Sequence, residues 1–165
     1  MSRKPSYPAS RVTARIPAHS RMDPVVSLAS AQDAEKAFYR AFAAQDLEAM
    51  MMIWADDDDI VCVHPMGARL QGRTAVLEGW SRLFGEDSAL RFEIQPVQAF
   101  EEGLLSVRLV HEHILTARSS RARPPVIATN AYRLTPRGWR MILHHASPSP
   151  ANARMLAGPA APFYH

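Results

Sequence analysis

Residues 61–80, VCVHPMGARLQGRTAVLEGW, decide the fold that we predict for this chain. A short apolar run ends at His64-Pro65, and a turn follows at Met66-Gly67. An amphipathic segment then begins at Arg73. The stretch therefore predicts a buried strand, a turn and the start of a helix, with a histidine at the end of the strand.

Three helices are expected in the first half of the chain. Ser30 is suited to cap a helix over 31–44, and Asp46 to cap a second helix from 47 to about 54. The third helix is expected over about 73–84 and ends near Gly85. Its apolar inner face holds Val76, Leu77, Trp80, Leu83 and Phe84.

The second half of the chain has the pattern of strands. Four strands are predicted, separated at two places by turns that contain Gly103 and Gly138; they span 90–100, 104–117, 126–134 and 139–146. Helices followed by a strand meander predict an α+β domain in which an antiparallel sheet lies against the helices.

Composition predicts one domain with two tails in a chain of 165 residues. Residues 1–29 are expected to form a disordered basic arm, residues 30–148 the domain, and residues 149–165 a Pro/Ala-rich tail. The arm has a net charge of +4, which leaves −1 on the rest of the chain. Since the body has no basic surface, we expect no nucleic-acid partner.

The same features bear on location. No run approaches the roughly 18 apolar residues of a membrane span, so we expect no membrane partner. Pro17, His19 and Arg21 interrupt any signal-peptide core, and a cytoplasmic protein is expected. The Arg-rich arm leaves an organelle transit peptide as an alternative, and Met22 is an alternative start.

The order of elements resembles the nuclear transport factor 2-like superfamily, and its SnoaL-like group in particular. The resemblance spans about residues 30–148 and is carried by Trp54 with its acidic run, VCVHPMG, LQGRTAVLEGW and the terminal GWRMILHHAS. The terminal stretch also resembles the association domain of calcium/calmodulin-dependent protein kinase II. The resemblance implies a cone-shaped curved sheet wrapped around the helices and a deep apolar pocket. It also implies a homodimer formed through the outer side of the sheet.

Two sets of side chains alternate on the strand over 104–117. Both sets are partly apolar, so alternation leaves the inner face open: one set holds Leu105, Val107, Leu109, His111, His113 and Leu115, and the other Ser106, Arg108, Val110, Glu112 and Ile114. The association-domain resemblance places Arg108 where that relative has a pocket arginine, which favours the second set as the lining. Asn130 stands where the relative has another arginine, so this match fails.

The last strand adds a histidine to this expected site. Alternation puts Met141, Leu143 and His145 on one face, and the resemblance matches His145 to a histidine of the relative. Side chains expected to converge in the pocket are Arg108, Glu112, Asn130, Tyr132 and His145, with Glu112 as the expected partner of Arg108. His64 is a further candidate, and the candidate walls are Trp54, Trp80, Phe42 and Tyr39.

Three functions remain open at this point. The first is binding of a small molecule without catalysis. The second is a cofactor-free lyase, isomerase or hydrolase that uses His145 assisted by Glu112 or His64. The third is a protein-association module. No cofactor motif is visible, and a metal site at His111 and His113 with His144 or His145 is a weaker alternative.

Overall fold

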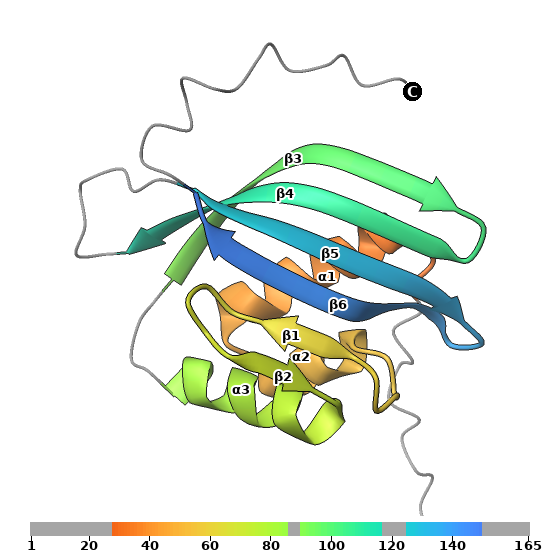
Figure 1. Cartoon of the computed structure of the whole chain (residues 1–165), viewed down its shortest axis with the longest axis horizontal. Helices are drawn as coiled ribbons and strands as arrows, with labels where there is room; N and C mark the ends of the chain where they lie inside the picture. Colours follow the sequence, from red (N-terminus) through yellow and green to blue (C-terminus); the bar gives the residue numbers. More distant parts are fainter. Residues whose placement is uncertain (1–27, 86–89, 117–124, 150–165) are drawn as a thin grey trace, which may run out of the picture.

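The computed structural model describes residues 28–85, 90–116 and 125–149. The predicted arm, apart from Leu28 and Ala29, and the C-terminal tail beyond Ser149 lie outside this part of the chain. Three helices and six strands follow one another in the order α1, α2, β1, β2, α3, β3, β4, β5, β6. The α+β fold with three N-terminal helices is therefore confirmed (Figure 1).

The helices begin where the sequence predicts. Helix α1 spans Ala31–Ala44, and the Ser30 side chain accepts a hydrogen bond from the Asp33 backbone N–H. Helix α2 spans Leu47–Ile53, and Asp46 accepts from the Ala49 backbone N–H in the same way. Each cap satisfies one of the N–H groups that the first turn of a helix leaves without a partner. Helix α3 spans Arg73–Gly85.

The sheet has six strands and is mixed. The strands are β1 (Val61–Val63), β2 (Arg69–Gln71), β3 (Leu90–Glu102), β4 (Leu105–Thr116), β5 (Val126–Thr135) and β6 (Gly138–Pro148). Their order in space is β2-β1-β6-β5-β4-β3. The predicted antiparallel meander β3–β6 is present, but β1 joins it parallel to β6 and carries β2 with it. The antiparallel meander is therefore confirmed, and the parallel pairing of β1 with β6 extends it to a mixed sheet that the sequence analysis did not predict.

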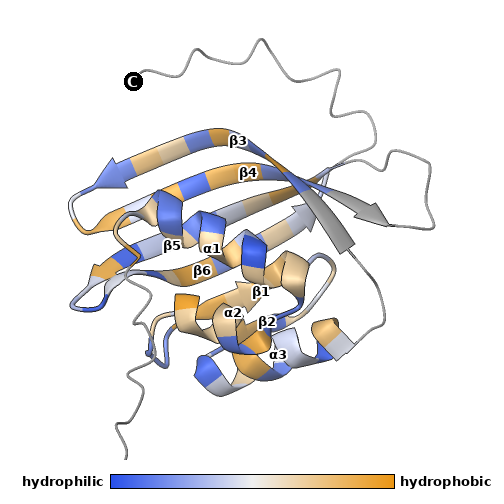
Figure 2. Cartoon of the chain, turned by 180° about the vertical axis from the view of Figure 1, so that it is seen from behind, coloured by the Kyte–Doolittle hydropathy of each residue, from blue (hydrophilic) through white to orange (hydrophobic). Residues whose placement is uncertain are grey.

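One face of the sheet is covered by helices and the other is not. Helix α1 crosses behind β5 and β6 in Figure 1, and the view from behind in Figure 2 shows α1, α2 and α3 in front of the sheet. The core lies between them and is built from all three helices and the inner sheet face; its fully buried side chains include Phe38, Met50, Trp54, Trp80, Tyr132 and Met141. Because this layer also contains buried polar groups, it is where a site is to be sought.

Leu28 belongs to the core, although the sequence assigned it to the arm. Its side chain is 4% exposed, and its backbone carbonyl accepts a hydrogen bond from Trp139 N–H. Gly138 (φ +93°) lies so close that a Cβ there would be 2.7 Å from the Leu28 oxygen. The β5–β6 turn therefore needs glycine at 138 both for its backbone conformation and for this contact.

Candidate functional site

Strand β4 turns the second of its two alternating sets toward α1. Ser106, Val110 and Glu112 are almost completely buried, whereas Leu105 on the other set is 42% exposed. Glu112 and Arg108 both form side-chain hydrogen bonds with residues of α1. The face assignment favoured by the association-domain resemblance is therefore correct.

Strand β6 differs from the prediction because it contains a bulge. Tyr132 of β5 pairs with Met141 and Ala131 with Leu143, so Ile142 has no partner across the strands. One extra residue reverses the alternation beyond it. His144 is consequently buried beside Asn130, whereas His145 is exposed. His145 therefore does not face inward with Arg108 and Asn130, as the sequence analysis expected; His144 faces inward instead.

Four buried side chains form a continuous chain of hydrogen bonds across the inner face. Tyr39 of α1 donates to Glu112 Oε1 at 2.8 Å and accepts from Asn130 Nδ2 at 3.0 Å. Asn130 Oδ1 lies 2.8 Å from His144 Nδ1. Since the amide nitrogen of Asn130 is already a donor to Tyr39, its oxygen must accept, and His144 Nδ1 carries the proton. This hydrogen-bonded network thus links β4, β5 and β6 to one another and to Tyr39 of α1.

Burial shifts the pKa values of the side chains in this hydrogen-bonded network. It raises the pKa of Glu112 to about 7, and the hydrogen bond from Tyr39 offsets part of that rise. It lowers the pKa of His144 to about 3, and the neighbouring His64 and His145 add to this lowering. It also raises the pKa of Tyr39, with the negative charge of Glu112 acting in the same direction. Near neutral pH the group that gains and loses a proton is therefore Glu112.

Arg108 has partners other than the predicted one. Its Nε donates to Glu35 of α1 at 2.8 Å, and its Nη1 donates to Glu101 of β3 at 2.9 Å. Glu112 bonds to Tyr39 instead, so the expected Arg108–Glu112 pair is not formed. The sequence offered no way to choose Glu35, because the pairing depends on how α1 docks on the sheet.

Tyr132 lies between these groups with its hydroxyl buried. Burial raises the pKa of Tyr132, the charges of Glu35 and Glu112 also raise it, and Arg108 lowers it. Within the described part of the chain, the Tyr132 hydroxyl has no hydrogen-bond partner. The same holds for Ser106 Oγ, on the residue that pairs with Tyr132 across β4 and β5.

Aromatic rings form the wall next to His144. Trp80 of α3 contacts the edges or faces of Phe38, Phe42 and His64, with ring centroids 5.5, 4.9 and 4.6 Å away. His64 lies 6.2 Å from His144 between ring centroids, and burial lowers its pKa. Trp54 is also buried, and its backbone forms a β-bridge with Met141 of β6. The structure thus brings His64, Trp80 and the polar chain together and leaves Trp54 near Tyr132.

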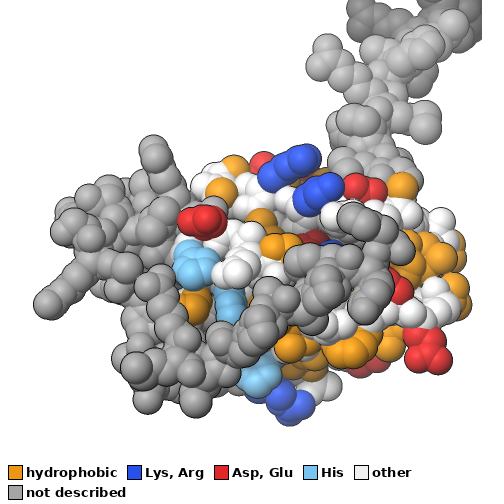
Figure 3. All heavy atoms as spheres, turned by 90° about the horizontal axis from the view of Figure 1, so that it is seen from above, with side chains coloured by type: hydrophobic (Ala, Val, Ile, Leu, Met, Phe, Trp, Pro, Cys, Tyr) orange, Lys and Arg blue, Asp and Glu red, His pale blue; other side chains and the backbone are white. Residues whose placement is uncertain are grey.

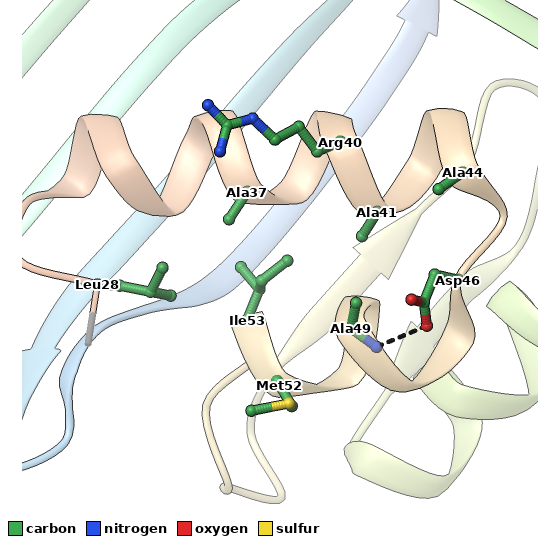
Figure 4. A pocket seen from close by; sticks show the side chains of 9 residues that line it. All are labelled: Leu28, Ala37, Arg40, Ala41, Ala44, Asp46, Ala49, Met52 and Ile53. Carbon is green, nitrogen blue, oxygen red and sulfur yellow. Dashed lines mark hydrogen bonds between the residues drawn. The ribbon is translucent and has the colours of Figure 1, made fainter. Parts of the chain in front are cut away.

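A separate hollow of about 270 Å³ lies between α1 and α2 (Figure 4). Alanines of the two helices, Leu28, Met52 and Ile53 line it, and Arg40 and Asp46 are its polar residues. Asp46 is occupied as the cap of α2. None of the lining residues belongs to the predicted site, so this hollow is not the pocket expected from the resemblance.

The metal alternative gains no support from the described residues, which hold no group of three suitable ligands. His111 and His113 lie on the outer face of β4, whereas His144 lies on the inner face of β6. Figure 3 shows histidine side chains gathered on one side of the surface seen from above. In the described segments, no helix is long and apolar enough to cross a membrane.

Comparisons with known proteins agree with this architecture. A solved structure from Thiobacillus denitrificans, provisionally described as a calcium/calmodulin-dependent protein kinase type II association domain, is 41% identical. The match covers 74% of this chain and 98% of that one, with a TM-score of 0.72. A protein from Streptomyces avermitilis, provisionally described as a dehydratase of the NTF2-like family, is 31% identical with a TM-score of 0.65. That match covers 72% of this chain and 92% of the other.

A plant protein and a family model complete the comparison. The F-box protein SKIP8 of Arabidopsis thaliana is 24% identical over 110 residues, which are 67% of this chain and 46% of that protein. The chain therefore spans about half the length of this relative. The model of the SnoaL-like domain matches residues 32–152, which run from the second residue of α1 to beyond the end of β6. The chain belongs to the SnoaL-like domain family, within the NTF2-like superfamily.

Proposed function

We propose that this protein binds a small molecule at the inner face of its sheet and works as a homodimer. The observation that carries the proposal is the Tyr132 hydroxyl, which is fully buried and has no partner in the described part of the chain. It lies within the electrostatic reach of Arg108, Glu35 and Glu112. A buried hydroxyl without a partner is costly, and a ligand that hydrogen-bonds to it would offset that cost.

The rest of the inner face suits such a ligand. Apolar and aromatic side chains dominate it, and a few polar groups are held in fixed orientations, which is the usual composition of a small-molecule site. Asn130 and Tyr39 hold one another in place. Apolar contact would supply most of the affinity, and the polar groups would set the orientation of the ligand.

The test is a thermal-shift screen of small alcohols, amines, ketones and carboxylates on the parent and two variants. Tyr132→Phe removes the unpartnered hydroxyl and keeps the ring. Thr129→Val is the control, because Thr129 lies on the outer face of the same strand. A compound that stabilises the parent and Thr129→Val but not Tyr132→Phe supports the inner site. Compounds that stabilise all three proteins equally would place the binding site elsewhere.

A second candidate function is acid–base catalysis without a cofactor. It is favoured by Glu112, whose pKa burial raises to about 7, where a carboxyl group both accepts and donates a proton efficiently. The relative provisionally described as a dehydratase is consistent with a lyase reaction. The catalytic role expected of His145 is not proposed, because His145 is exposed.

Hydrogen exchange separates catalysis from binding. A ketone found in the screen is incubated with the protein in D₂O, and exchange at the carbon beside its carbonyl is followed by NMR. Exchange that Glu112→Gln abolishes, and that the exposed control Glu48→Gln retains, would identify Glu112 as the base. Binding of the ketone without exchange in the parent would leave this protein a binding protein.

The proposed homodimer uses the sheet face that no helix covers (Figure 1). Support comes from the exposed apolar side chains of Phe100 on β3 and Leu105 on β4, and from a relative described as an association domain. A monomeric protein seldom leaves a large contiguous apolar patch in solvent.

A further inference from the structure

Three buried oxygen atoms next to Arg108 have no hydrogen-bond partner within the described segments. They are Glu35 Oε1, Ser106 Oγ and Tyr132 Oη. Their residues are neighbours, since Ser106 pairs with Tyr132 across two strands and Glu35 bonds to Arg108. Native proteins leave few buried polar atoms without a partner, so three in one place point to a missing donor.

The charges around these atoms are unbalanced. Arg108 is the cation on this part of the inner face, and two carboxylates, Glu35 and Glu101, already bind it. The cluster therefore carries one positive and two negative charges. An incoming anion would find the guanidinium occupied and two carboxylates nearby. This argues against an anionic ligand group at Arg108.

The unpartnered carboxylate oxygen adds a second restriction. An ionised carboxylate accepts hydrogen bonds and cannot donate them, so Glu35 Oε1 requires a donor. The hydroxyls of Ser106 and Tyr132 are each able to accept as well. A group with three N–H donors and one positive charge would satisfy all three oxygens and neutralise the cluster.

We propose that the cluster of Glu35, Ser106 and Tyr132 binds the primary ammonium group of a small amine. This inference rests on the proposed function and names the ligand class of that inner site. The amine would enter where the Arg108–Glu101 pair meets solvent, since the Glu101 side chain is 53% exposed. Glu101 is the exposed partner of this pair, whereas the Arg108 side chain is 13% exposed, so it is the Glu101 carboxylate that can move into water. The Arg108–Glu35 pair, which is mostly buried, stays in place.

Three probes of matched size and different charge test the proposal. They are n-butylammonium chloride, 1-butanol and sodium butyrate, titrated into the full chain at constant ionic strength. Binding is followed by chemical-shift changes in NMR and by calorimetry. We expect butylammonium to bind more tightly than butanol and butyrate to bind most weakly, because only the ammonium group supplies charge and three donors.

Variants locate the binding. Tyr132→Phe and Ser106→Ala each remove one acceptor and leave the Arg108–Glu35 pair intact, so both are expected to fold. Each should weaken butylammonium by about tenfold or more, the effect of losing a hydrogen bond to a charged group. Glu35→Gln should weaken it further. Glu48→Gln, an exposed position on α2, is the matched control and should leave binding unchanged.

The outcomes distinguish this inference from the function on which it rests. Butyrate or butanol binding as tightly as butylammonium, with Tyr132→Phe weakening it, would overturn the amine and keep an inner ligand site. If Tyr132→Phe, Ser106→Ala and Glu35→Gln all leave the affinity for butylammonium unchanged, the amine binds elsewhere and the inference is overturned. Absence of binding by all three probes would overturn it as well, and would count against the inner site itself.

Discussion

Two tyrosines on the inner face have opposite hydrogen-bond situations. Tyr39 donates to Glu112 and accepts from Asn130, so its hydroxyl satisfies two other buried groups. The hydroxyl of Tyr132 satisfies none among the described residues. The same substitution therefore has different consequences at the two positions, because the cost of a lost hydroxyl depends on the partners left behind.

We expect Tyr39→Phe to lower the free energy of unfolding by about 1–3 kcal/mol, the cost of leaving buried partners without a bond. Tyr132→Phe should leave it unchanged or raise it by up to roughly 1 kcal/mol in the absence of ligand. Urea unfolding of both variants beside the parent measures the difference. Equal losses at the two positions would show that the Tyr132 hydroxyl has a partner in solution.

The raised pKa of Glu112 predicts that the stability of the folded protein depends on pH. Burial raises the folded pKa of Glu112 to about 7, above its ordinary value of 4.5, so between these values the folded state binds the proton more tightly than the unfolded state. Stability contributed by this proton is present below pH 4.5 and is lost as pH rises through 7. Each unit of pKa difference corresponds to 1.36 kcal/mol, so the free energy of unfolding falls by roughly 3 kcal/mol over this pH range.

The buried His144 acts in the opposite direction, since its lowered pKa reduces stability as pH falls below about 6.5. The comparison must therefore be between variants. We expect Glu112→Gln to gain stability relative to the parent between pH 4.5 and 7, measured by urea unfolding at each pH. Glu48→Gln is the control. A parent and a Glu112→Gln variant with parallel profiles would mean that the Glu112 carboxyl has an ordinary pKa.

At the scale of elements, the bulge in β6 decides which histidine enters the core. We expect His144→Ala to lower the free energy of unfolding by about 2–4 kcal/mol, because it removes a buried ring and the bond to Asn130. His145→Ala should change it by no more than about 0.5 kcal/mol, as an exposed position does. Denaturant unfolding of the two variants is the measurement, and a larger loss at His145 would contradict the register of β6.

The same bulge shows where inference from the sequence ends. Caps and periodicity located α1 and α2 to within a residue or so, and the inward face of β4 that the resemblance favoured was predicted correctly. A bulge leaves no mark in an alternating pattern, so counting by two along β6 selected His145. Partners such as Glu35 and Tyr39 come from a helix far away in the sequence. Their contacts depend on helix docking, which no local pattern records.

At the scale of the whole molecule, the buried Leu28 extends the core beyond the N-terminus of α1. We expect a variant that starts at Pro24 to have a free energy of unfolding within roughly 0.5 kcal/mol of that of the full chain, because it keeps the buried Leu28. A variant that starts at Ser30 should lose about 1.5–3 kcal/mol, the value of burying one leucine. Thermal and urea unfolding of the pair measure this. A large loss in the Pro24 variant would show that earlier residues dock on the domain.

The uncovered face of the sheet sets the last expectation, which concerns assembly. On the outer face of the sheet, two large apolar side chains are exposed: Phe100 of β3 is 57% exposed and Leu105 of β4 is 42% exposed. Leu109 lies in the middle of β4 on the outer face and is partly exposed. A second chain packed on this face would remove these groups from water.

We expect Leu109→Glu to convert a dimer into monomers in sedimentation, because it places an unpaired charge in the contact between the two sheets. Leu77→Glu is the matched control, since Leu77 is a 40% exposed leucine on α3, away from that face, and its variant should remain dimeric. Both variants should keep the circular dichroism of the parent, because neither leucine is in the buried core. A dimer mass unchanged by Leu109→Glu, or abolished by Leu77→Glu, would move the interface from the sheet to the helical side of the molecule.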